Sequence, residues 1–284
     1  MAVWLIAGTS TGFGHELTKI ILENGDIAVA TARRPEALAA LAAQCPAAAD
    51  RLLVLKLDVT QEQDVLAAFA AAKAKFGRVD VVANNTGYGT LGEIESVPDA
   101  DAHAMFETNF WGAARVSREA VRFFREENPA GAGGRLLQFS SVAGFQGFSG
   151  MAYYTATKFA LEGFSESLAS ELDPAWNIQV TIIEPGGFVT NALKGESQWA
   201  SMHPAYDRPE LLAAAFKRVL IESPPSGDAR KGMEVVYKLA SLERQPLHFP
   251  HGKDAVAAAR VKTSSFLSDT DKYASWSEGL ERDA

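Results

Sequence analysis

The sequence predicts a single α/β domain whose core is a doubly wound parallel sheet of about seven strands with helices on both faces. Three observations lead to this fold class. Short β-branched runs alternate with longer helical patterns, most of these runs are apolar throughout, and the first run leads directly into a glycine-rich turn. Continuous apolar runs are typical of strands that are covered on both faces. Strand–helix–strand units of this kind are joined by right-handed crossovers.

The expected strands are the apolar runs Val3–Ala7, Ile27–Ala32, Leu52–Leu57, Val79–Ala83, Arg135–Ser140, Gln179–Ile183 and a short Leu247–Phe249. Helical spacing or a proline at a first helical position predicts helices over Gly14–Leu22, Pro35–Ala43, Gln61–Phe76, Leu211–Ile221 and Arg230–Leu242. The alanine-rich tract Ala37–Ala49 is interpreted as helix because alanine is the best helix former. The residues 223–227, Ser-Pro-Pro-Ser-Gly, are expected to separate the last two of these helices.

Composition excludes some classes of function. The formal net charge is −8 and the pI is about 5.2, which argues against a nucleic-acid partner because phosphate binding needs a basic face. The single cysteine, Cys45, has no partner for an intramolecular disulfide, which fits a reducing compartment. No apolar run approaches the roughly 20 residues that span a bilayer, and the apolar N-terminus is too short for a signal peptide. We therefore expect a cytoplasmic protein without a membrane span.

A glycine-rich turn, Gly8-Thr9-Ser10-Thr11-Gly12-Phe13-Gly14, follows the first strand and opens a helix. Glycines let a backbone approach a pyrophosphate closely, and a helix N-terminus supplies amide donors and partial positive charge. An ordinary tight turn is the alternative, but strand, glycine turn and amphipathic helix is the context that a dinucleotide site requires. The candidate cofactor-binding residues of this turn are Gly8, Ser10, Thr11, Gly12, Phe13 and Gly14.

The end of the second strand indicates which dinucleotide fits. A site for NAD places an acidic residue there to bind the ribose 2′-hydroxyl. This chain instead has Arg33 and Arg34, whose guanidinium groups suit a 2′-phosphate. The prediction is NADP(H) with Arg33 as the phosphate ligand, and the alternative is that these arginines only solvate a surface loop.

A catalytic group is predicted from Tyr154 and Lys158, which stand four residues apart in a helical stretch and therefore share a face. Ser141 follows the fifth strand at the edge where open parallel sheets bind ligands. A lysine ammonium and a positive nicotinamide would lower the pKa of the phenol from its ordinary value near 10. Tyr154 would then act as general acid or base on a carbonyl/alcohol pair while Ser141 holds the oxygen.

With these residues the sequence resembles the short-chain dehydrogenase/reductase family, from about Val3 to Thr190 and with a similar tail. Four further motifs agree: Asp58-Val59-Thr60, Asn84-Asn85-Thr86-Gly87, Thr108-Asn109-Phe110-Trp111-Gly112 and Pro185-Gly186-Gly187-Phe188-Val189-Thr190. The resemblance implies a Rossmann-type fold with strand order 3-2-1-4-5-6-7. It also implies an NADP-preferring member of the carbonyl reductase or hydroxysteroid dehydrogenase kind.

The resemblance also implies roles for single residues. Asn109, Ser141, Tyr154 and Lys158 would form the catalytic tetrad, with Asn109 at a helix kink that holds a proton-relaying water and Lys158 also on the nicotinamide ribose. Asp58 and Val59 would contact the adenine, and Asn84 would support the sheet edge beside the cofactor. The remaining cofactor residues would be Asn85, Pro185, Gly186 and Thr190. The alternatives are that Asp58 caps a turn, that Asn84 and Asn85 adopt turn geometry, and that Asn109 is an exposed helix residue.

Two departures from the family pattern concern the cofactor. Ala7 stands where the glycine motif usually begins with threonine, and Thr86 stands where relatives commonly have alanine. The removal of a hydroxyl at position 7 puts the anchoring of the glycine turn in doubt. Neither departure touches the tetrad.

No linker divides the chain, so residues 1–284 are expected as one dinucleotide-binding catalytic domain, with a substrate lid over 188–221 and a helical tail over 254–284. The expected reaction is NADP(H)-dependent interconversion of a ketone or aldehyde and its alcohol. Phe145, Phe148, Met151 and Trp199 are candidates for an apolar substrate pocket, suited to aromatic ketones, steroids or retinoids, or else for ordinary core packing.

Two other functions stay open. One is an NADP-binding sensor without turnover, and the other is an epimerase or dehydratase of the same family. The resemblance implies a homodimer or homotetramer. No metal is expected, because the five histidines are scattered and no Cys/His/Asp spacing resembles a metal site.

Overall fold

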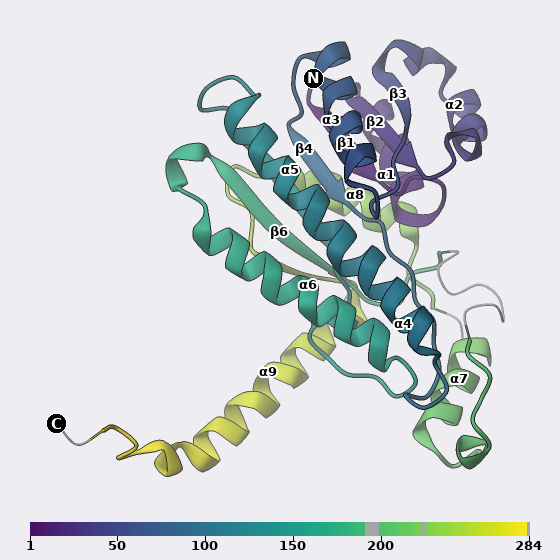
Figure 1. Cartoon of the computed structure of the whole chain (residues 1–284), viewed down its shortest axis with the longest axis vertical. Helices are drawn as coiled ribbons and strands as arrows, with labels where there is room; N and C mark the ends of the chain where they lie inside the picture. Colours follow the sequence, from purple (N-terminus) through teal and green to yellow (C-terminus); the bar gives the residue numbers. More distant parts are fainter. Residues whose placement is uncertain (191–198, 223–224, 283–284) are drawn as a thin grey trace.

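The computed structural model describes residues 1–190, 199–222 and 225–282. All seven strands form one parallel sheet in the order β3-β2-β1-β4-β5-β6-β7, which confirms the predicted fold class and strand order (Figure 1). The strands are β1 (Val3–Ala7), β2 (Ile27–Ala32), β3 (Leu52–Lys56), β4 (Val81–Asn84), β5 (Gly134–Phe139), β6 (Ile178–Pro185) and β7 (His248–His251). The direction in which successive strands are added to the sheet reverses between β1 and β4. Folds of this kind bind ligands at such a switch point, at the carboxyl edge of the sheet.

Helices cover both faces of this sheet. Their bounds are α1 (Gly12–Glu23), α2 (Ala39–Gln44), α3 (Glu62–Phe76), α4 (Asp99–Phe106), α5 (Ala113–Glu126), α6 (Ala152–Glu171), α7 (Leu212–Glu222), α8 (Ala229–Ala240) and α9 (Lys253–Tyr273). One face carries α1 and α8, and the other carries α3, α5 and α6. The central strand β1 is buried along its whole length. Its consecutive residues Leu5 and Ile6 point to opposite faces of the sheet and belong to different hydrophobic cores.

The alanine-rich region folds differently from its prediction. Instead of one helix over Pro35–Ala43 or Ala37–Ala49, the chain forms a 3₁₀ turn (Pro35–Leu38), the short α2 and a second 3₁₀ segment (Pro46–Arg51). The residue before a proline is disfavoured in the α conformation, and Cys45 has left it with φ of −121°. Proline therefore overrides the helix propensity of the alanines.

Several strand boundaries also shift by one or two residues. The predicted strand Val79–Ala83 begins only at Val81, because Asn128 of the loop after α5 binds the backbone N–H and C=O of Val79. The predicted strand Leu247–Phe249 is β7, which runs from His248 to His251. Helix α1 begins at Gly12, two residues earlier than expected, so its first turn lies within the glycine motif.

The C-terminal part contains α7 within the region expected as a lid, while residues 191–198 of that region and Ser223-Pro224 of the expected break lie outside the described residues. Helix α9 leaves the sheet and projects away from the body, followed by a 3₁₀ turn (Ala274–Ser277) (Figure 1). The outer part of α9 and the turn after it expose apolar side chains, among them Phe266 of the helix and Trp276 of the turn. Within the described residues no helix is both long and apolar enough to cross a membrane.

Candidate active site

The candidate site residues gather where β1, β4, β5 and β6 end, because the carboxyl ends of parallel strands meet at one edge of the sheet. The glycine turn follows β1, Asn85 follows β4, Ser141 follows β5 and the Pro185 motif closes β6. Helix α6 begins beside this edge and carries Tyr154 and Lys158. The topology thus brings together segments that lie far apart in the sequence.

The glycine turn presents the N-terminus of α1 at this edge. Gly12 has φ of +61°, a left-handed conformation that favours glycine. A side chain at Gly14 would collide with the carbonyl of Gly8, so the turn closes only with glycine there. The N-cap residue Thr11 makes no side-chain capping bond and the first turn holds no acidic residue. Its amides are therefore free to bind an anion such as a pyrophosphate.

Neighbouring strands anchor the turn despite Ala7. The Thr9 hydroxyl donates to the Thr31 carbonyl at 3.0 Å, and the Thr31 hydroxyl donates to the Ile6 carbonyl at 2.9 Å. The Asn85 amide donates to the Gly8 carbonyl at 2.9 Å. The hydrogen bonds of Thr9 and Asn85 therefore anchor the glycine turn, although Ala7 lacks the hydroxyl of the usual threonine.

The catalytic candidates lie in contact across the gap between β5 and α6. The Ser141 hydroxyl is a hydrogen-bond partner of the Tyr154 phenol, and Ser141 Oγ accepts from the Ala143 amide at 3.1 Å. Lys158 Nζ lies 5.8 Å from the centre of the Tyr154 ring and donates to the Phe139 carbonyl at 2.8 Å. A Cβ at Gly89 would lie 3.1 Å from Cδ2 of the Tyr154 ring, so the Gly89 backbone also packs against this ring. The phenol is thus held in place by helix, loop and backbone.

Burial sets the protonation of both groups. Burial lowers the pKa of Lys158 to about 8, and the negative charge of Glu162 partly opposes this effect. Burial also raises the pKa of Tyr154, while its hydrogen bond with Ser141 acts in the opposite direction. Tyr154 is therefore a protonated acid at neutral pH in the absence of a cofactor.

Asn109 lies in a π-helical segment (Glu107–Gly112) between α4 and α5 and is fully buried. Such segments interrupt α-helices at functional sites. Its Nδ2 donates to the Tyr88 carbonyl at 2.8 Å and to Thr157 Oγ1 at 3.1 Å, and its Oδ1 accepts from the Tyr88 amide at 3.0 Å. A side chain at Gly87 would lie 3.3 Å from Asn109 Oδ1 and 3.4 Å from Lys158 Nζ, so both side chains border the space beside Gly87. Asn109 is thus not on an exposed helix face.

The outer part of the candidate cofactor site contains Arg33 and Asp58. Arg33 is exposed and lines a hollow of about 460 Å³ with Thr60, Gln61, Tyr88, Ala104, Glu107 and Thr108. Asp58 Oδ1 accepts from the Thr60 amide and hydroxyl, so it does cap the turn before α3. Val59 is buried against Gly112 of the π-helical segment. The second carboxylate oxygen of Asp58 is not used in these bonds.

The loop after β6 meets the glycine turn. Thr190 lies near Gly12, where an added Cβ would be 3.5 Å from Thr190 Cβ. Asp254, in the first turn of α9, accepts from the Gly187 amide at 2.6 Å and occupies the space beside Gly186. Phe13 packs on Phe139 and Phe188, so its side chain joins the core while its backbone belongs to the turn.

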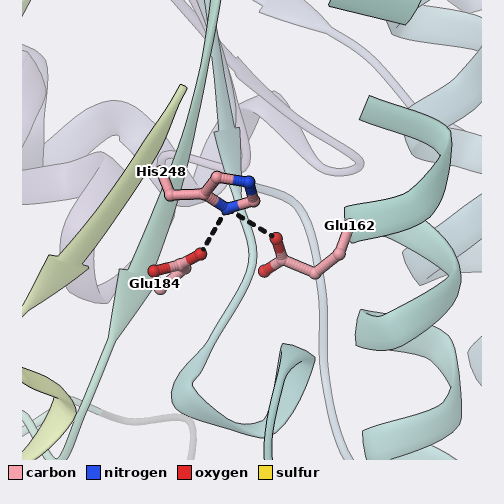
Figure 2. A group of neighbouring side chains, drawn as sticks. All are labelled: Glu162, Glu184 and His248. Atoms are coloured by element: carbon pink, nitrogen blue, oxygen red, sulfur yellow. Dashed lines mark hydrogen bonds and ion pairs between the residues drawn. The ribbon is translucent and has the colours of Figure 1, made fainter. Parts of the chain in front are cut away.

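Sequence analysis did not identify a cluster of Glu162, Glu184 and His248 (Figure 2). His248 Nδ1 lies 2.9 Å from Glu184 Oε1 and 3.7 Å from Glu162 Oε2. Each residue offers one potential metal-ligating atom within 4.8 Å of the others. They come from α6, β6 and β7, so no local spacing in the sequence connects them. Glu162 follows Lys158 by four residues, and this was the one signal available.

A second unpredicted network is buried between β4, β5 and α5. Asn84 Nδ2 donates to Gln138 Oε1 at 2.8 Å and to the Ala113 carbonyl at 2.9 Å, and Gln138 Nε2 donates to Ser117 Oγ at 2.7 Å. Asn84 therefore supports the sheet edge, with Gln138 as its unforeseen partner. These bonds hold the strand ends from which Asn85 and Ser141 extend.

The aromatic candidates are divided between neighbouring elements. Phe148 stacks on Phe216 of α7 with ring centres 6.0 Å apart, and Trp199 lies beside Lys217 of the same helix. Phe145 and Met151 are half-buried. Helix α7 thus contacts the loop that precedes Tyr154.

Comparisons with known proteins agree with this geometry. Residues 2–201 match the family model described as short chain dehydrogenase. An uncharacterised oxidoreductase of Schizosaccharomyces pombe is 37% identical over 98% of this chain and 91% of its own length. A 3-ketodihydrosphingosine reductase of Bacteroides thetaiotaomicron is 31% identical over 93% of both chains.

Solved structures show the same fold. The crystal structure of a short-chain dehydrogenase from Streptomyces avermitilis matches with a TM-score of 0.86 and 34% identity, covering 99% of this chain and 98% of that one. More distant matches include a Burkholderia phymatum protein in complex with NAD and a Burkholderia cenocepacia protein in complex with NADP, 22% and 20% identical. Neighbours of this fold therefore bind either dinucleotide.

Proposed function

Because the chain belongs to the short-chain dehydrogenase family, we propose that it is an NADP(H)-dependent oxidoreductase that interconverts a ketone or aldehyde and the corresponding alcohol. One observation carries the proposal. The Tyr154 phenol, hydrogen-bonded with Ser141, stands beside the buried amine of Lys158 at the edge where the uncapped N-terminus of α1 awaits a pyrophosphate. An acid, an oxygen-holding hydroxyl and a dinucleotide cradle share one edge.

The chain's own residues carry the proton. Ser141 Oγ accepts from the Ala143 amide, so its proton is the part of the hydroxyl left to donate, to the Tyr154 oxygen in this structure and to a substrate oxygen bound between the two. Tyr154 donates its phenolic proton to that oxygen in reduction and removes it in oxidation. The Lys158 ammonium beside the ring stabilises the phenolate that remains. A bound nicotinamide supplies or accepts the hydride.

Asn109 and the cofactor-binding residues position these groups. Asn109 fixes the Tyr88 backbone and Thr157, which in turn donates to the Tyr154 carbonyl at 2.7 Å. The turn from Gly8 to Gly14 would hold the pyrophosphate, and Thr190 and the Pro185-Gly186 segment would border the nicotinamide. Asp58 and Val59 would border the adenine.

NADP(H) rather than NAD(H) is proposed from Arg33. This exposed guanidinium stands directly after β2 with no acidic residue in its place, beside the hollow next to the Asp58 turn. A 2′-phosphate would accept paired, charge-assisted bonds there. The ribose 2′-hydroxyl of NAD offers this arginine no comparable partner.

The substrate is proposed to be apolar. Phe148 and Phe216 stack beside the loop that leads to Tyr154, and Trp199 flanks the same region. The relative named as a 3-ketodihydrosphingosine reductase acts, by its name, on a ketone. We further propose that the described part of 188–221, α7 above all, serves as the lid over this region.

The exposed aromatic residues Trp111 and Phe159 lie on the segments that carry Asn109 and Lys158. A homodimer or homotetramer is proposed to cover them, because large apolar side chains grouped on adjoining helices mark association surfaces.

Cofactor turnover tests the proposal. Loss of NADPH absorbance is followed against a panel of apolar ketones and aldehydes, with NADH in parallel and Arg33→Ala as the variant. The KM for NADPH should rise 10- to 100-fold in Arg33→Ala, the magnitude of a lost charge-assisted pair, while the KM for NADH stays constant. The neighbouring Arg34→Ala is the matched control. Equal use of NADH by the wild type would overturn the cofactor assignment, and tight NADPH binding without turnover would overturn the reductase assignment.

A further inference from the structure

The outer part of helix α9 is exposed on all sides. Its base is held by Asp254 and by Ala255, which is buried, but every described residue from 260 to 282 is exposed (Figure 1). An isolated helix shorter than about 15 residues is marginal in water, and most helices are stabilised by the packing of an apolar face. A packing partner is therefore expected for the outer part of α9.

One side of α9 carries an apolar stripe with the spacing of a coiled coil. The stripe consists of two sets of positions with heptad spacing, Val256, Thr263 and Thr270 in the first set and Ala259, Phe266 and Tyr273 in the second. Phe266 and Tyr273 are 72% and 44% exposed. Ala259 follows the buried Ala255 by four residues, so the stripe continues the side by which α9 packs on the body of the protein.

The stripe is complementary to itself when two copies of α9 run antiparallel. Each position of the first set then faces a position of the second set, so Thr263 lies opposite Phe266 of the second copy and Val256 lies opposite its Tyr273. A small side chain meets a large one in each of these layers, as close packing requires. A parallel pair would instead place Phe266 against Phe266 and Thr263 against Thr263.

The charges beside the stripe favour the same arrangement. Lys262 and Asp269 are exposed, border the same side of the stripe and are separated by one heptad. In an antiparallel pair, Lys262 of each copy lies beside Asp269 of the other copy, so the twofold axis creates two pairs of opposite charge. In a parallel pair these positions would face Leu267 and Ala274, which carry no charge.

We propose that α9 pairs antiparallel with α9 of a second copy of this chain, in an interface separate from the one proposed around Trp111 and Phe159. This pairing does not depend on the proposed reaction. The tip of each α9 then lies beside the base of the other. A lipid surface fits the helix less well, because Asp269 and Asp271 lie on it and the whole chain has a net charge of −8.

Sedimentation velocity of the full chain tests the pairing. Phe266→Asp removes the central aromatic layer, so the mass in solution should be about half of the wild-type mass, whether or not the other interface forms. Lys262→Asp and Asp269→Lys each place like charges opposite one another twice, so the dissociation constant should rise roughly tenfold or more. The same charge changes away from the stripe, Asp271→Lys and Lys272→Asp, are the matched controls.

A mixture of the two charge variants tests the direction of pairing. Combined in equal amounts, Lys262→Asp and Asp269→Lys present only opposite charges across an antiparallel pair. The mixture should therefore associate about as tightly as the wild type, although each variant alone does not. If the mixture does not associate, the antiparallel register is wrong.

Hydrogen exchange gives a reading that is local to α9. The amides of residues 260–273 should exchange slowly in the wild type and rapidly in Phe266→Asp, because only a packed helix protects them. The substituted side chains are all exposed, so the core of the protein stays intact. An unchanged mass in Phe266→Asp would overturn the pairing. If that variant also loses binding to phosphatidylglycerol vesicles, the stripe belongs to a lipid surface instead.

Discussion

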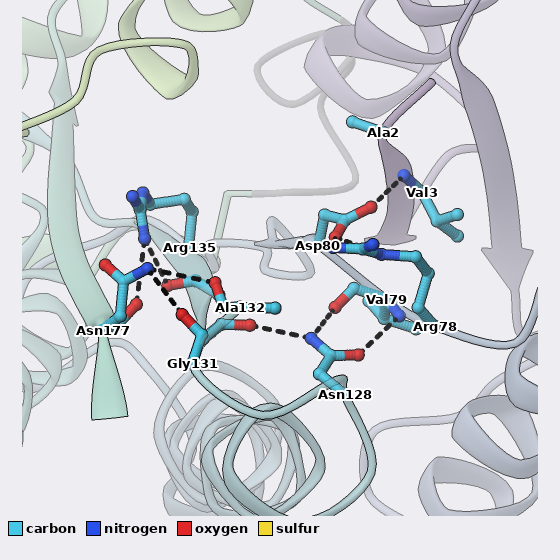
Figure 3. A network of polar contacts seen from close by, with 12 residues as sticks. Ala2, Val3, Arg78, Val79, Asp80, Asn128, Gly131, Ala132, Arg135 and Asn177 are labelled. Carbon is cyan, nitrogen blue, oxygen red and sulfur yellow. Dashed lines mark hydrogen bonds and ion pairs between the residues drawn. The ribbon is translucent and has the colours of Figure 1, made fainter. Parts of the chain in front are cut away.

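The two edges of the sheet use polar groups in opposite ways. At the amino edge, Asp80 accepts from the Val3 amide at 2.8 Å and from Arg78 Nε at 2.7 Å (Figure 3). Asn128 accepts from the Val79 amide and donates to the carbonyls of Val79 and Gly133. Loops and strand starts are thus tied together by side chains whose hydrogen-bonding capacity is largely used.

At the carboxyl edge, buried polar atoms are left over. Of the seven buried side-chain atoms without a hydrogen-bond partner in the described residues, four lie at or near the ends of β4, β5 and β7: Asn84 Oδ1, Ser140 Oγ, Glu162 Oε1 and His251 Nε2. Only one, Trp4 Nε1, lies near the start of a strand. Unpaired buried polar groups cost stability. Most polar side chains at the amino edge thus stabilise the fold through hydrogen bonds, whereas several buried polar atoms at the carboxyl edge have no partner and lie near the candidate active site. This difference matches the general trade-off between stability and function.

The largest expected effect separates activity from stability at the carboxyl edge. Tyr154→Phe removes only the phenolic oxygen, so kcat/KM for carbonyl reduction should fall by about a thousandfold, the usual contribution of a general acid. The midpoint of denaturant unfolding should stay within experimental error, since Ser141 is the one group bonded with that oxygen among the described residues. Steady-state kinetics and urea unfolding check both. A variant with substantial activity would remove Tyr154 from the mechanism.

The converse change lies at the amino edge. Asn128→Ala deletes three hydrogen bonds and leaves the Val79 amide buried and unpaired, so the free energy of unfolding should fall by about 3 kcal/mol. Where the variant is folded, kcat/KM should match the wild type. Asn177→Gly is the matched control, because Asn177 has φ of +52° and glycine keeps that conformation at a cost below about 1 kcal/mol. A loss of kcat/KM in folded Asn128→Ala would mean that the edges are not independent.

Gly144→Ala should break the separation. The added methyl group meets Ser140 and Glu162 together, so the loop that carries Ser141 must move. We expect a loss of about 2 kcal/mol in unfolding free energy, typical of overpacking, together with a tenfold or greater loss of kcat. The control is Gly147→Ala in the same loop, where an added Cβ meets nothing within 4 Å. Equal behaviour of the two variants would contradict the close packing at Gly144.

The smallest effect concerns pH. The pKa of Glu162 is raised by burial to about 7 in the fold, from 4.5 in the unfolded chain, so the stability that its protonated form gives is complete below about pH 4.5 and is lost as pH rises through 7. Glu162→Gln lacks this loss. Its unfolding free energy relative to wild type should therefore increase by about 1–2 kcal/mol between pH 5 and 8. Urea unfolding across this range measures it, and a flat difference would show that Glu162 is not desolvated.

Sequence patterns predicted the sheet because its information is local. The continuous apolar runs follow from burial on both faces and match the structure, whereas the strand order, which the structure also confirms, came from the resemblance to the family. Errors fell where a single residue overrides the surrounding pattern. Asn128, 49 residues from Val79, shortens the start of β4, and Pro46 divides the alanine-rich helix. The effect of Asn128 is not visible in a window of strand propensity, whereas Pro46 lies within the alanine-rich tract and its neighbours' helix propensity outweighed it in the prediction.

The candidate site was predictable to the extent that its residues lie in short motifs. The glycine turn and the Tyr154–Lys158 spacing carry their chemistry within a few residues, and the structure brings them to one edge. Glu184 and His248 are 64 residues apart in sequence and meet only because β6 and β7 are neighbours. Asp254 likewise reaches the loop after β6 from the first turn of α9. Tertiary pairings of this kind leave no sequence pattern.

The contact between Asp254 and Gly187 connects α9 to the loop after β6. The helix has 21 residues, and at 1.5 Å per residue its arm is about 30 Å long. The base of the helix is held by Asp254, which accepts a hydrogen bond from the Gly187 amide beside the candidate nicotinamide position. The exposed end of the helix thus lies about 30 Å from the loop to which its first turn is bonded. One helix therefore joins an exposed apolar tip to the loop that borders the candidate cofactor site.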